Sequence, residues 1–490
     1  MNGRAKSALN CISATQRLRV KKALFTINAP LGLWRFLWQK GRMNQNEHLP
    51  PLACVVLAAG QGTRMKSDLP KVLHPVAGVP MLRHVLNVCE ALSPERIIVV
   101  VSPNSSAIEK VAAPHMCIVQ KTPVGTGDAV KAARKALVDF AGNIIVLFGD
   151  GPLITVDSLR LMQRKRETTN ATVVVAGFSP ENPASYGRLI IDESGNLSKI
   201  IEASETSSEQ NITGLCNGGV MLFDSGKLWT LLDQLQDNNA KKEFFLTDCV
   251  ALAQQSGDTS VVATISEDEV LGINTRVELA QAEKIMQKRL REKAMLAGVT
   301  MIDPDSVFLS ADTKFGRDIV IAPHVIIGEG VEIADNVQIR AFTHLEHVTV
   351  ERSAVIGPFS RIRPNSRIGI EAHIGNFVEI KNSDIDTGAK VNHLSYVGDS
   401  NVGAKTNIGA GTITANYDGV NKNHTEIGKD VSIGSNTVLV APVVLGDGVT
   451  VAAGSVVTKN VPADALAVAR AKQENKEGWA KRLREGKKNK

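Results

Sequence analysis

The stretch VIGPFSRIRPNSRIGIEAHIGNFVEI, residues 355–380, decides the fold of the second half of the chain. An isoleucine returns every six residues along it, and glycine often follows that isoleucine. A period of six fits neither an α-helix, which repeats every 3.6 residues, nor the two-residue alternation of an ordinary strand. It is typical of a parallel β-helix built from hexapeptides, in which each hexapeptide supplies one short strand and one corner.

The same period continues on both sides of this stretch, with one phase shift. The aliphatic residues at this spacing are Ile321, Ile327, Ile333, Ile339, Ile356, Ile362, Ile368, Ile374, Ile380, Ile427, Ile433, Leu439, Val451 and Val457. A β-sandwich with chance spacing is the alternative, and the number of repeats in register argues against it. The period breaks at TITANYDGVNKNHTE, residues 412–426. An insertion into a solenoid must leave the coil as a loop, and such loops often carry function.

Residues from Leu52 to about Thr275 follow a different pattern. The apolar runs ACVVLAAG, RIIVVVS, NIIVLFGD and ATVVVAGF alternate with segments of helical composition. This pattern predicts an α/β domain with a mainly parallel sheet, which binds ligands at the carboxyl ends of its strands. Residues 275–297 lack Gly and Pro and predict one long helix that is stopped by Gly298.

These patterns divide the chain into four parts. We expect a basic N-terminal extension (1–48), an α/β domain (49–273), a helical linker (274–297) and a β-helix domain with a basic tail (298–490).

Charge is unevenly distributed along the 490 residues. The net charge is +6, but residues 1–46 carry nine Lys or Arg and no Asp or Glu, so the remainder is at −3. The basic C-terminal cluster KRLREGKKNK has no aromatic ladder beside it, so we interpret it as a solvated tail rather than a nucleic-acid site. The basic leader is similar to a transit peptide. We favour the alternative that translation starts at Met43.

Cysteine usage and hydropathy set further limits. The six cysteines are scattered and form no CxxC pair, which argues against a disulfide framework or a zinc site and fits a reducing compartment. No apolar run approaches the roughly 18 to 20 residues that a membrane-spanning helix needs. We therefore expect a cytoplasmic protein that binds neither membrane nor nucleic acid.

The stretch LAAGQGTRMKSDLPK, residues 57–71, follows the first expected strand. Its glycines allow a turn whose backbone N–H groups face a phosphate, although such a turn also occurs without a ligand. It is neither a Walker A loop nor a GxGxxG motif. Arg64 and Lys71 favour the interpretation of this stretch as a phosphate-binding loop, because both can neutralise polyphosphate charge. Asp150, in VLFGDGPL, follows a later strand and is either a Mg²⁺ ligand or a turn-capping residue.

Taken together, these motifs resemble a known family. The Gly-rich loop with its GTRM and Pro-Lys is similar to the sugar-nucleotidyltransferase signature, and the similarity extends through Gln120, GTG (125–127), FGD (148–150), YGR (186–188) and GINTR (272–276). With the hexapeptide repeats, residues 52–490 resemble the bacterial bifunctional N-acetylglucosamine-1-phosphate uridyltransferase/glucosamine-1-phosphate acetyltransferase enzymes. The resemblance implies an α/β nucleotidyltransferase (Rossmann-like) domain followed by a left-handed parallel β-helix, and a homotrimer.

The resemblance implies two consecutive reactions. The second half would transfer an acetyl group from acetyl-CoA to glucosamine-1-phosphate. The first half would then transfer a uridylyl group from UTP and release pyrophosphate. The product, UDP-N-acetylglucosamine, is a precursor of peptidoglycan and lipopolysaccharide. Uridylyl transfer would be a direct in-line attack on the α-phosphorus, with catalysis by positioning and electrostatics.

The resemblance also assigns residues to the first reaction. Arg64 would stabilise charge on the pyrophosphate, Lys71 would contact phosphate, and Asp150 and Asn274 would hold Mg²⁺. The residues that would bind the nucleotide and the sugar are Leu57, Ala58, Ala59, Gly60, Gln120, Gly125, Thr126, Phe148, Gly149, Gly187, Glu202 and Asn217.

In the second half, Arg363 and Lys381 are eighteen residues apart, about one coil, so they should stack and suit a phosphate. His393 lies two hexads beyond Lys381, on a different face, and would meet those cations across a protomer interface or through the inserted loop. The resemblance makes His393 the general base for the amine. It assigns Tyr396 and Asn407 to the sugar, and it assigns to acetyl-CoA Ala410, Asn416, Tyr417, Ser435, Ala453 and Arg470.

Three residues depart from the family pattern: Gly151, Ser185 and Ser204. Ser204 replaces a lysine near the sugar, so sugar selectivity is where an effect is expected. Two other hypotheses compete with a bifunctional enzyme. One is a nucleotidyltransferase with a regulatory β-helix, against which His393 and the inserted loop argue. The other is a structural β-helix scaffold, which leaves Arg64, Lys71 and Asp150 unexplained.

Overall fold

The computed structural model describes residues 49–488 except 61, 181, 184–185, 203–213 and 240–241. The basic extension of residues 1–48 and the departures at Ser185 and Ser204 lie outside the described residues. The first described region is an α/β domain whose central sheet has the strand order β11-β7-β10-β6-β1-β4-β5. These strands are β1 (Leu52–Leu57), β4 (Arg96–Val101), β5 (Met116–Val119), β6 (Asn143–Phe148), β7 (Val173–Phe178), β10 (Cys216–Asp224) and β11 (Ser260–Thr264).

The sheet is mixed rather than uniformly parallel. Strands β4 and β6 flank β1 in parallel, as predicted, but β10 runs antiparallel to both β6 and β7. Strands β8 (Arg188–Ile191) and β9 (Leu197–Ile201) pair with each other antiparallel, and β8 also pairs with β10. Strands β2 (Pro75–Val76) and β3 (Val79–Pro80) form a separate hairpin. Mixed sheets are common among the large sheets of α/β folds, and alternating apolar runs do not encode strand direction.

Helices cover both faces of this sheet. Along β1, Cys54 and Val56 belong to one buried cluster, and Val55 and Leu57 to the other, because successive side chains point to opposite faces. The described helices of this domain are α3 (Met81–Ala91), α4 (Ser106–Ala112), α5 (Thr126–Ala132), α6 (Arg134–Leu137), α7 (Val156–Thr169), α8 (Ser225–Asp233) and α9 (Cys249–Gln255). A double-sided core of this kind holds the strand ends that carry the first site in place.

The long helix predicted for residues 275–297 is α10 (Arg276–Leu296). Thr275 caps it: the Thr275 hydroxyl accepts from the Glu278 N–H, and the Glu278 carboxylate accepts from the Thr275 N–H. This capping box satisfies backbone donors that the first turn leaves unpaired. The helix ends before Gly298, whose φ of 104° suits a residue without a Cβ.

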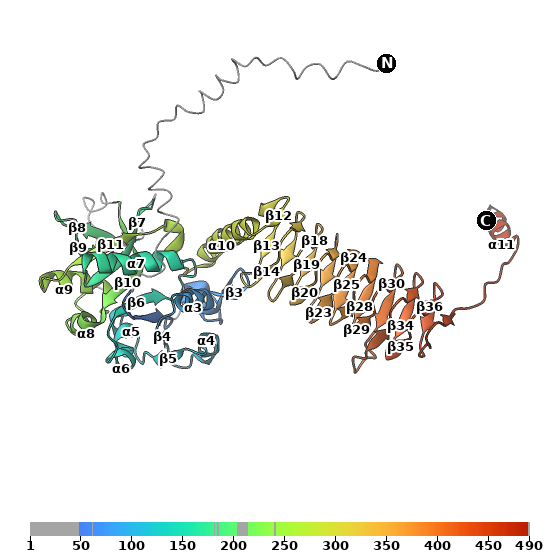
Figure 1. Cartoon of the computed structure of the whole chain (residues 1–490), viewed down its shortest axis with the longest axis horizontal. Coiled ribbons are helices and arrows are strands. Elements are labelled where there is room, and N and C mark those ends of the chain that lie inside the picture. Colours follow the sequence, from blue (N-terminus) through green and yellow to red (C-terminus); the bar gives the residue numbers. More distant parts are fainter. Residues whose placement is uncertain are drawn as a thin grey trace, which may run out of the picture. The chain divides into compact units, whose positions relative to one another are not determined.

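Residues 299–467, which are described without a gap, form a β-helix of three parallel sheets (Figure 1). The fold predicted from the hexapeptide period is therefore confirmed, and the sheets are consistent with the left-handed form. Face 1 consists of β12 (Val299–Met301), β15 (Ile319–Ile321), β18 (Gln338–Ile339), β21 (Val355–Ile356), β24 (His373–Asn376), β27 (Lys390–His393), β30 (Asn407–Ile408), β33 (Ser432–Ile433), β36 (Thr450–Val451) and β38 (Leu466–Ala467).

The other two faces follow in chain order within each coil. Face 2 consists of β13 (Phe308–Leu309), β16 (Ile326–Ile327), β19 (His344–Leu345), β22 (Arg361–Ile362), β25 (Glu379–Lys381), β28 (Tyr396–Gly398), β31 (Ile413–Ala415), β34 (Val438–Val440) and β37 (Val456–Val457). Face 3 consists of β14 (Lys314–Phe315), β17 (Glu332–Ile333), β20 (Val348–Val350), β23 (Ser366–Ile368), β26 (Asp384–Ile385), β29 (Ser400–Val402), β32 (Thr425–Ile427) and β35 (Val443–Leu445). We call the edge between faces 1 and 2 the 1/2 corner, and the next edge the 2/3 corner.

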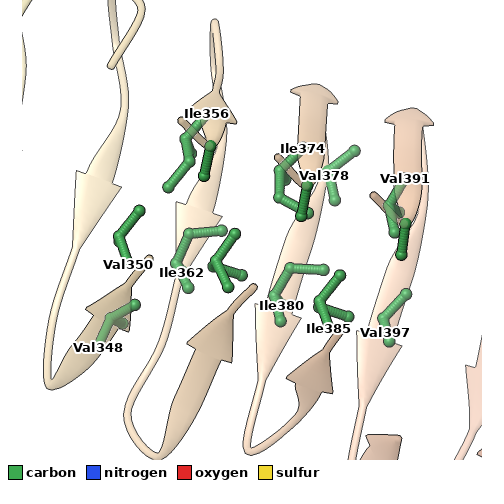
Figure 2. Close-up of a cluster of buried hydrophobic side chains, with 14 of the residues drawn as sticks. Val348, Val350, Ile356, Ile362, Ile374, Val378, Ile380, Ile385, Val391 and Val397 are labelled. Atoms are coloured by element: carbon green, nitrogen blue, oxygen red, sulfur yellow. The ribbon is translucent and has the colours of Figure 1, made fainter. Parts of the chain in front are cut away.

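The six-residue aliphatic positions fill the inside of this prism. Every one of them is buried, and equivalent residues of successive coils stack, as Ile356 does on Ile374 and Ile362 on Ile380 (Figure 2). Burying an isoleucine side chain stabilises a fold by roughly 1.5–3 kcal/mol, so the repeat supplies both the register and the core. After the last coil, helix α11 (Trp479–Lys488) ends the described chain. Within the described chain, no helix is long and apolar enough to cross a membrane.

Candidate functional sites

The Gly-rich loop leaves the end of β1 and turns back toward Lys71. Gly62 has a φ of 62°, and a Cβ there would lie 2.5 Å from the Cβ of Lys71. Only glycine combines that backbone conformation with that close approach. A short 3-10 helix, Thr63–Met65, follows and carries Arg64, and a second one, Lys71–Leu73, begins at Lys71. The tight turn therefore directs two cations toward the carboxyl ends of β1 and β6.

Four predicted residues meet at this sheet edge. The Lys71 ammonium forms a very short ion pair with the Asp150 carboxylate and donates to Asn274 Oδ1 at 3.1 Å. Arg64 donates to the same Asn274 oxygen at 2.9 Å. The side chains of Lys71 and Asp150 are mostly buried. Asp150 and Asn274 are the two residues predicted to hold a metal. The Lys71 ammonium therefore bridges their side-chain oxygens, although the two residues are 124 positions apart in the sequence.

Two adjoining cavities surround this cluster. One, of about 320 Å³, is lined by the nucleotide-binding candidates Leu57, Ala58, Ala59, Gly60, Gln120, Gly125 and Thr126, together with Lys71. The other, of about 510 Å³, is lined by Arg64, Glu202, Asn217 and Asn274. Phe148 and Asp150 line both cavities. The candidates predicted to bind the nucleotide and those predicted to bind the sugar therefore line two different cavities, and Asp150 belongs to both.

The larger of these two cavities includes one of the departures from the family pattern. Gly151 lines this cavity, and a Cβ at Gly151 would be 3.5 Å from its nearest neighbour, an ordinary contact. A Cβ would therefore fit at this position, and glycine leaves that space open. Gly187 accepts from the Asn217 backbone N–H at 2.8 Å, and Gly149 donates to the Leu57 carbonyl at 2.9 Å. Neither glycine lines either of these two cavities itself, but each is hydrogen-bonded to a residue that does.

Several residues that the sequence did not single out hold these candidates in place. Asp128 accepts from the Gln120 amide nitrogen at 2.8 Å, which leaves the Gln120 oxygen to accept from a ligand. Glu278 accepts from the Asn274 backbone N–H at 2.7 Å and so orients Asn274. The TxxE pattern of a capping box is a signal that the sequence does contain at residues 275–278.

Arg276 ties the Gly-rich loop to the start of α10. Its guanidinium donates to the Met65 carbonyl at 3.3 Å and lies 3.3 Å from His74 Nδ1. Burial lowers the pKa of His74, and the nearby Arg276 charge adds to this. A neutral His74 accepts the bond from Arg276. Arg276 is the last residue of the GINTR motif, whereas no motif marks His74.

In the β-helix, the predicted phosphate-binding pair lies along the 2/3 corner. Arg363 and Lys381 occupy equivalent positions one coil apart, because Ile362 pairs with Ile380 and the Arg363 N–H donates to the Ile380 carbonyl. The stacking predicted from their spacing is confirmed. Each cation also has a carboxylate partner: Glu379 is 2.8 Å from Arg363, and Asp399 is 4.0 Å from Lys381.

His393 lies on the 1/2 corner, at the end of β27 on face 1. It is exposed, and its Nδ1 is 3.0 Å from Asn376 Oδ1, one coil earlier. An amide oxygen accepts only, so this contact places the imidazole proton on Nδ1 and leaves a lone pair on Nε2. Asn376 was missed by motif reading, although the coil length places it directly beside His393.

Residues with small side chains continue the 1/2 corner beyond His393. In each coil, the residue after the corner position donates its backbone N–H to the equivalent corner residue of the coil before. Gly411 donates to His393, Asn436 to Ala410 and Gly454 to Ser435. His393, Ala410, Ser435 and Ala453 are therefore equivalent positions in successive coils. Arg470, which is exposed, follows beyond Ala453. The structure thus aligns three of the predicted coenzyme residues, Ala410, Ser435 and Ala453, with the predicted base.

The inserted segment forms the expected loop. It leaves face 2 after β31 and returns at β32, so residues 416–424 extend beyond the coil. Asn416 is buried at the loop entry, and Tyr417 is exposed within it. Tyr396 points outward from face 2, and Asn407 from face 1. Within one chain, His393 and the pair Arg363/Lys381 therefore lie on different corners, as predicted.

Comparisons with known proteins agree with both halves. The family model of the MobA-like NTP transferase domain matches residues 54–245, and that of the GMPPB C-terminal domain matches residues 344–461. The chain is 51% identical over 434 residues to a Bifunctional protein GlmU of Paramagnetospirillum magneticum, covering 88% of this chain and 96% of that protein. Proteins of the same name from Zymomonas mobilis (45% over 445 residues, 90% and 99%) and Jannaschia sp. (47% over 438 residues, 89% and 96%) are also similar.

Proposed function

The chain belongs to the family of bifunctional GlmU proteins, and from this premise we propose which of its residues form the two active sites. The protein synthesises UDP-N-acetylglucosamine. It transfers an acetyl group from acetyl-CoA to glucosamine-1-phosphate, and it then transfers a uridylyl group from UTP to the acetylated sugar phosphate with release of pyrophosphate. In our assignment the first half carries uridylyl transfer and the β-helix carries acetyl transfer.

The observation that carries the assignment of the first site is the position of the Lys71 ammonium, between the oxygens of Asp150 and Asn274. A carboxylate and an amide oxygen that already share one cation are suited to Mg²⁺, which takes oxygen ligands. Among the described residues, no group of three or more His, Cys, Asp and Glu side chains forms a closed metal site. Asp150 and Asn274 would therefore hold Mg²⁺ together with substrate phosphates and water.

When bound, Mg²⁺ would neutralise charge on the phosphates of UTP. The protein residues do the rest by positioning. Gln120 reads the uracil edge with its free oxygen, and Lys71 and Arg64 bind phosphate oxygens. Asn217 and Glu202 orient the sugar so that its phosphate oxygen faces the α-phosphorus in line. Such positioning converts a bimolecular step into an effectively unimolecular one.

For the second site we propose that His393 removes a proton from the glucosamine amine through Nε2. The free amine then attacks the thioester carbonyl, and the carbon–sulfur bond breaks as the amide forms. The proton that the attacking nitrogen loses goes to the sulfur, so coenzyme A leaves as the thiol. Arg363 and Lys381 bind the sugar phosphate. The line of small residues beyond His393 would accept the extended arm of acetyl-CoA, with successive coils about 4.8 Å apart. Arg470 would bind one of its phosphates.

We propose that three copies of the chain complete this second site. His393 and the two phosphate-binding cations lie on different corners, so a neighbouring copy would bring them together. Outward residues of face 2 support this: Ile326, Ile413 and Val456 are each about half exposed. Face 3 carries outward ion pairs such as Lys314–Glu332 and Arg367–Asp384, with Val444 as an exposed apolar residue. Exposed apolar surface gathered on one face is typical of an interaction site.

The oligomer can be tested with two matched valines. We expect Val456→Asp on face 2 to dissociate the trimer, because an unpaired carboxylate would be buried between copies. Acetyl transfer should then fall with the loss of the shared site, and uridylyl transfer should persist. Val444→Asp on face 3 changes a valine of similar exposure (46%, against 50% for Val456) and should leave the trimer intact. Light scattering after gel filtration measures the mass; a monomeric wild-type protein would contradict the proposal.

The two activities separate in one assay. With glucosamine-1-phosphate, acetyl-CoA and UTP, we expect free thiol first and pyrophosphate afterwards. Adding EDTA should stop pyrophosphate release and leave thiol release unchanged, because only the first site depends on a metal. Added Mg²⁺ should restore pyrophosphate release. Persistent pyrophosphate release in EDTA would contradict the metal assignment, and the absence of thiol release would contradict the second site.

Because UTP and acetyl-CoA are cytoplasmic metabolites, we also propose that the protein acts in the cytoplasm.

A further inference from the structure

Asp399 is a buried carboxylate on the 2/3 corner that no motif marks. It follows β28 and lies one coil beyond Asn382, since its backbone N–H donates to the Lys381 carbonyl at 3.0 Å. The residue is only 8% exposed and has a φ of 48°. A buried carboxylate is costly unless hydrogen bonds and a nearby charge compensate it. The groups around Asp399 that provide this compensation come from both halves of the proposed acetyl site.

On one side, Asp399 holds the inserted loop at both ends. Its carboxylate accepts a very short hydrogen bond from the Asn416 amide nitrogen, at the loop entry. Its backbone carbonyl accepts from the Thr425 N–H at 3.1 Å, where the chain rejoins the coil. The loop is closed above this point by the Asn423 N–H, which donates to the Asn416 carbonyl at 2.7 Å. One residue thus anchors entry and exit of the loop.

On the other side, the same carboxylate faces the phosphate-binding end of the site. Asn382 donates its amide nitrogen to Asp399 Oδ1 at 2.6 Å, and the Lys381 ammonium lies 4.0 Å from Oδ2. The Lys381 side chain is itself mostly buried. The carboxylate therefore attracts Lys381 in the resting protein and limits where its ammonium can be.

We propose that Asp399 is a positioning residue that holds the coenzyme loop, residues 416–424, and Lys381 in one fixed relation. It touches neither substrate; it acts through Asn416 on the coenzyme side and through Lys381 on the sugar-phosphate side. This inference rests on the function proposed for the second site. Its consequence is that one substitution weakens the binding of both substrates.

Asp399→Asn tests this without changing side-chain volume. Asparagine tolerates the positive φ, but its amide nitrogen would face the amide donors of Asn382 and Asn416 and would carry no charge for Lys381. We expect the KM values for acetyl-CoA and for glucosamine-1-phosphate each to rise about tenfold or more, the effect of losing a buried hydrogen bond to a charged group. The kcat should change much less, because His393 lies on another corner. Asp399→Gly, which also accepts the positive φ, should act in the same way.

Two further readouts exclude a merely structural role. Hydrogen exchange at the Asn423 and Thr425 amides should accelerate in Asp399→Asn, and uridylyl transfer should keep its wild-type rate. Asp430→Asn is the matched control: Asp430 also has a positive φ, of 55°, but is exposed, and its replacement should change neither KM. An unchanged KM for either substrate, or unchanged exchange in the loop, would overturn the proposal.

Single variants distinguish this inference from the function on which it rests. Asn416→Ala should raise only the acetyl-CoA KM, and Lys381→Ala only the sugar-phosphate KM. In the Asn416→Ala background, Asp399→Asn should no longer raise the acetyl-CoA KM but should still raise the other, because contacting residues are energetically coupled. If neither single variant changes its KM, the proposed second site is wrong. If both do and Asp399→Asn does not, only the positioning role is wrong.

Discussion

Replacing His393 with alanine is expected to lower the kcat of acetyl transfer by about 10²- to 10⁴-fold, the usual contribution of a general base. The imidazole is exposed at the 1/2 corner, and its contact with Asn376 Oδ1 leaves Nε2 free to accept a proton. No other group replaces that lone pair in the variant. Uridylyl transfer should be unchanged, because we assign it to the residues around Asp150. Thiol release and pyrophosphate release from the same preparation measure the two rates.

The neighbours of His393 supply the controls for this result. His373→Ala removes another exposed histidine of face 1 and should leave both activities intact. Asn376→Ala should lower acetyl transfer less than His393→Ala does, since it releases the orientation of the ring but retains the base. A folded His393→Ala protein with wild-type thiol release would exclude this histidine as the base. Loss of both activities would instead contradict the independence of the two sites.

Replacing Asp150 with alanine should have the opposite pattern. We expect uridylyl transfer to fall by about 10²-fold or more, on the scale seen when one electrostatic group of an active site is removed. The substitution removes the only carboxylate that contacts Lys71 among the described residues, and with it the anionic ligand proposed for Mg²⁺. Acetyl transfer should remain, which also shows that the variant is folded. Pyrophosphate release at saturating UTP measures the effect.

Charge and size at this position can be separated. Asp150→Asn keeps an oxygen ligand but loses the negative charge, so it should retain more activity than Asp150→Ala and require a higher Mg²⁺ concentration. Asp157→Ala, which removes an exposed acid from the first turn of α7, should leave the Mg²⁺ dependence unchanged. Equal activity of Asp150→Ala and the wild type would remove Asp150 from the metal site.

Much of the fold can be predicted from the periodicity of the sequence alone. The six-residue spacing of Ile356, Ile362 and Ile374 places each of these residues inside the β-helix, because a strand and a corner together take six residues. The same spacing predicts that Arg363 stacks on Lys381 and that the inserted segment, residues 416–424, leaves the coil as a loop. The direction of β10 was not predictable, because an apolar run packs equally well in a parallel and in an antiparallel strand.

The residues of the candidate sites were likewise predictable only in part. Residues that we propose to contact a ligand, such as Lys71 and Asp150, stand in recognisable motifs near strand ends. Residues that hold them, such as Asp128 and Asp399, do not. Their partners are brought near by coil register or helix packing, and their own sequence context is that of an ordinary surface acid.

The amino-acid sequence by itself determined the class of both domains, the register of the β-helix and the identity of the chemical groups, because side-chain periodicity and local turn preferences are properties of short segments. Only the tertiary structure decided which groups share a cation and which carboxylate anchors the loop. Those relations join residues such as Lys71 and Asn274, or Asp399 and Asn416, through space. Their energies depend on distance and burial, which no local pattern of residues encodes.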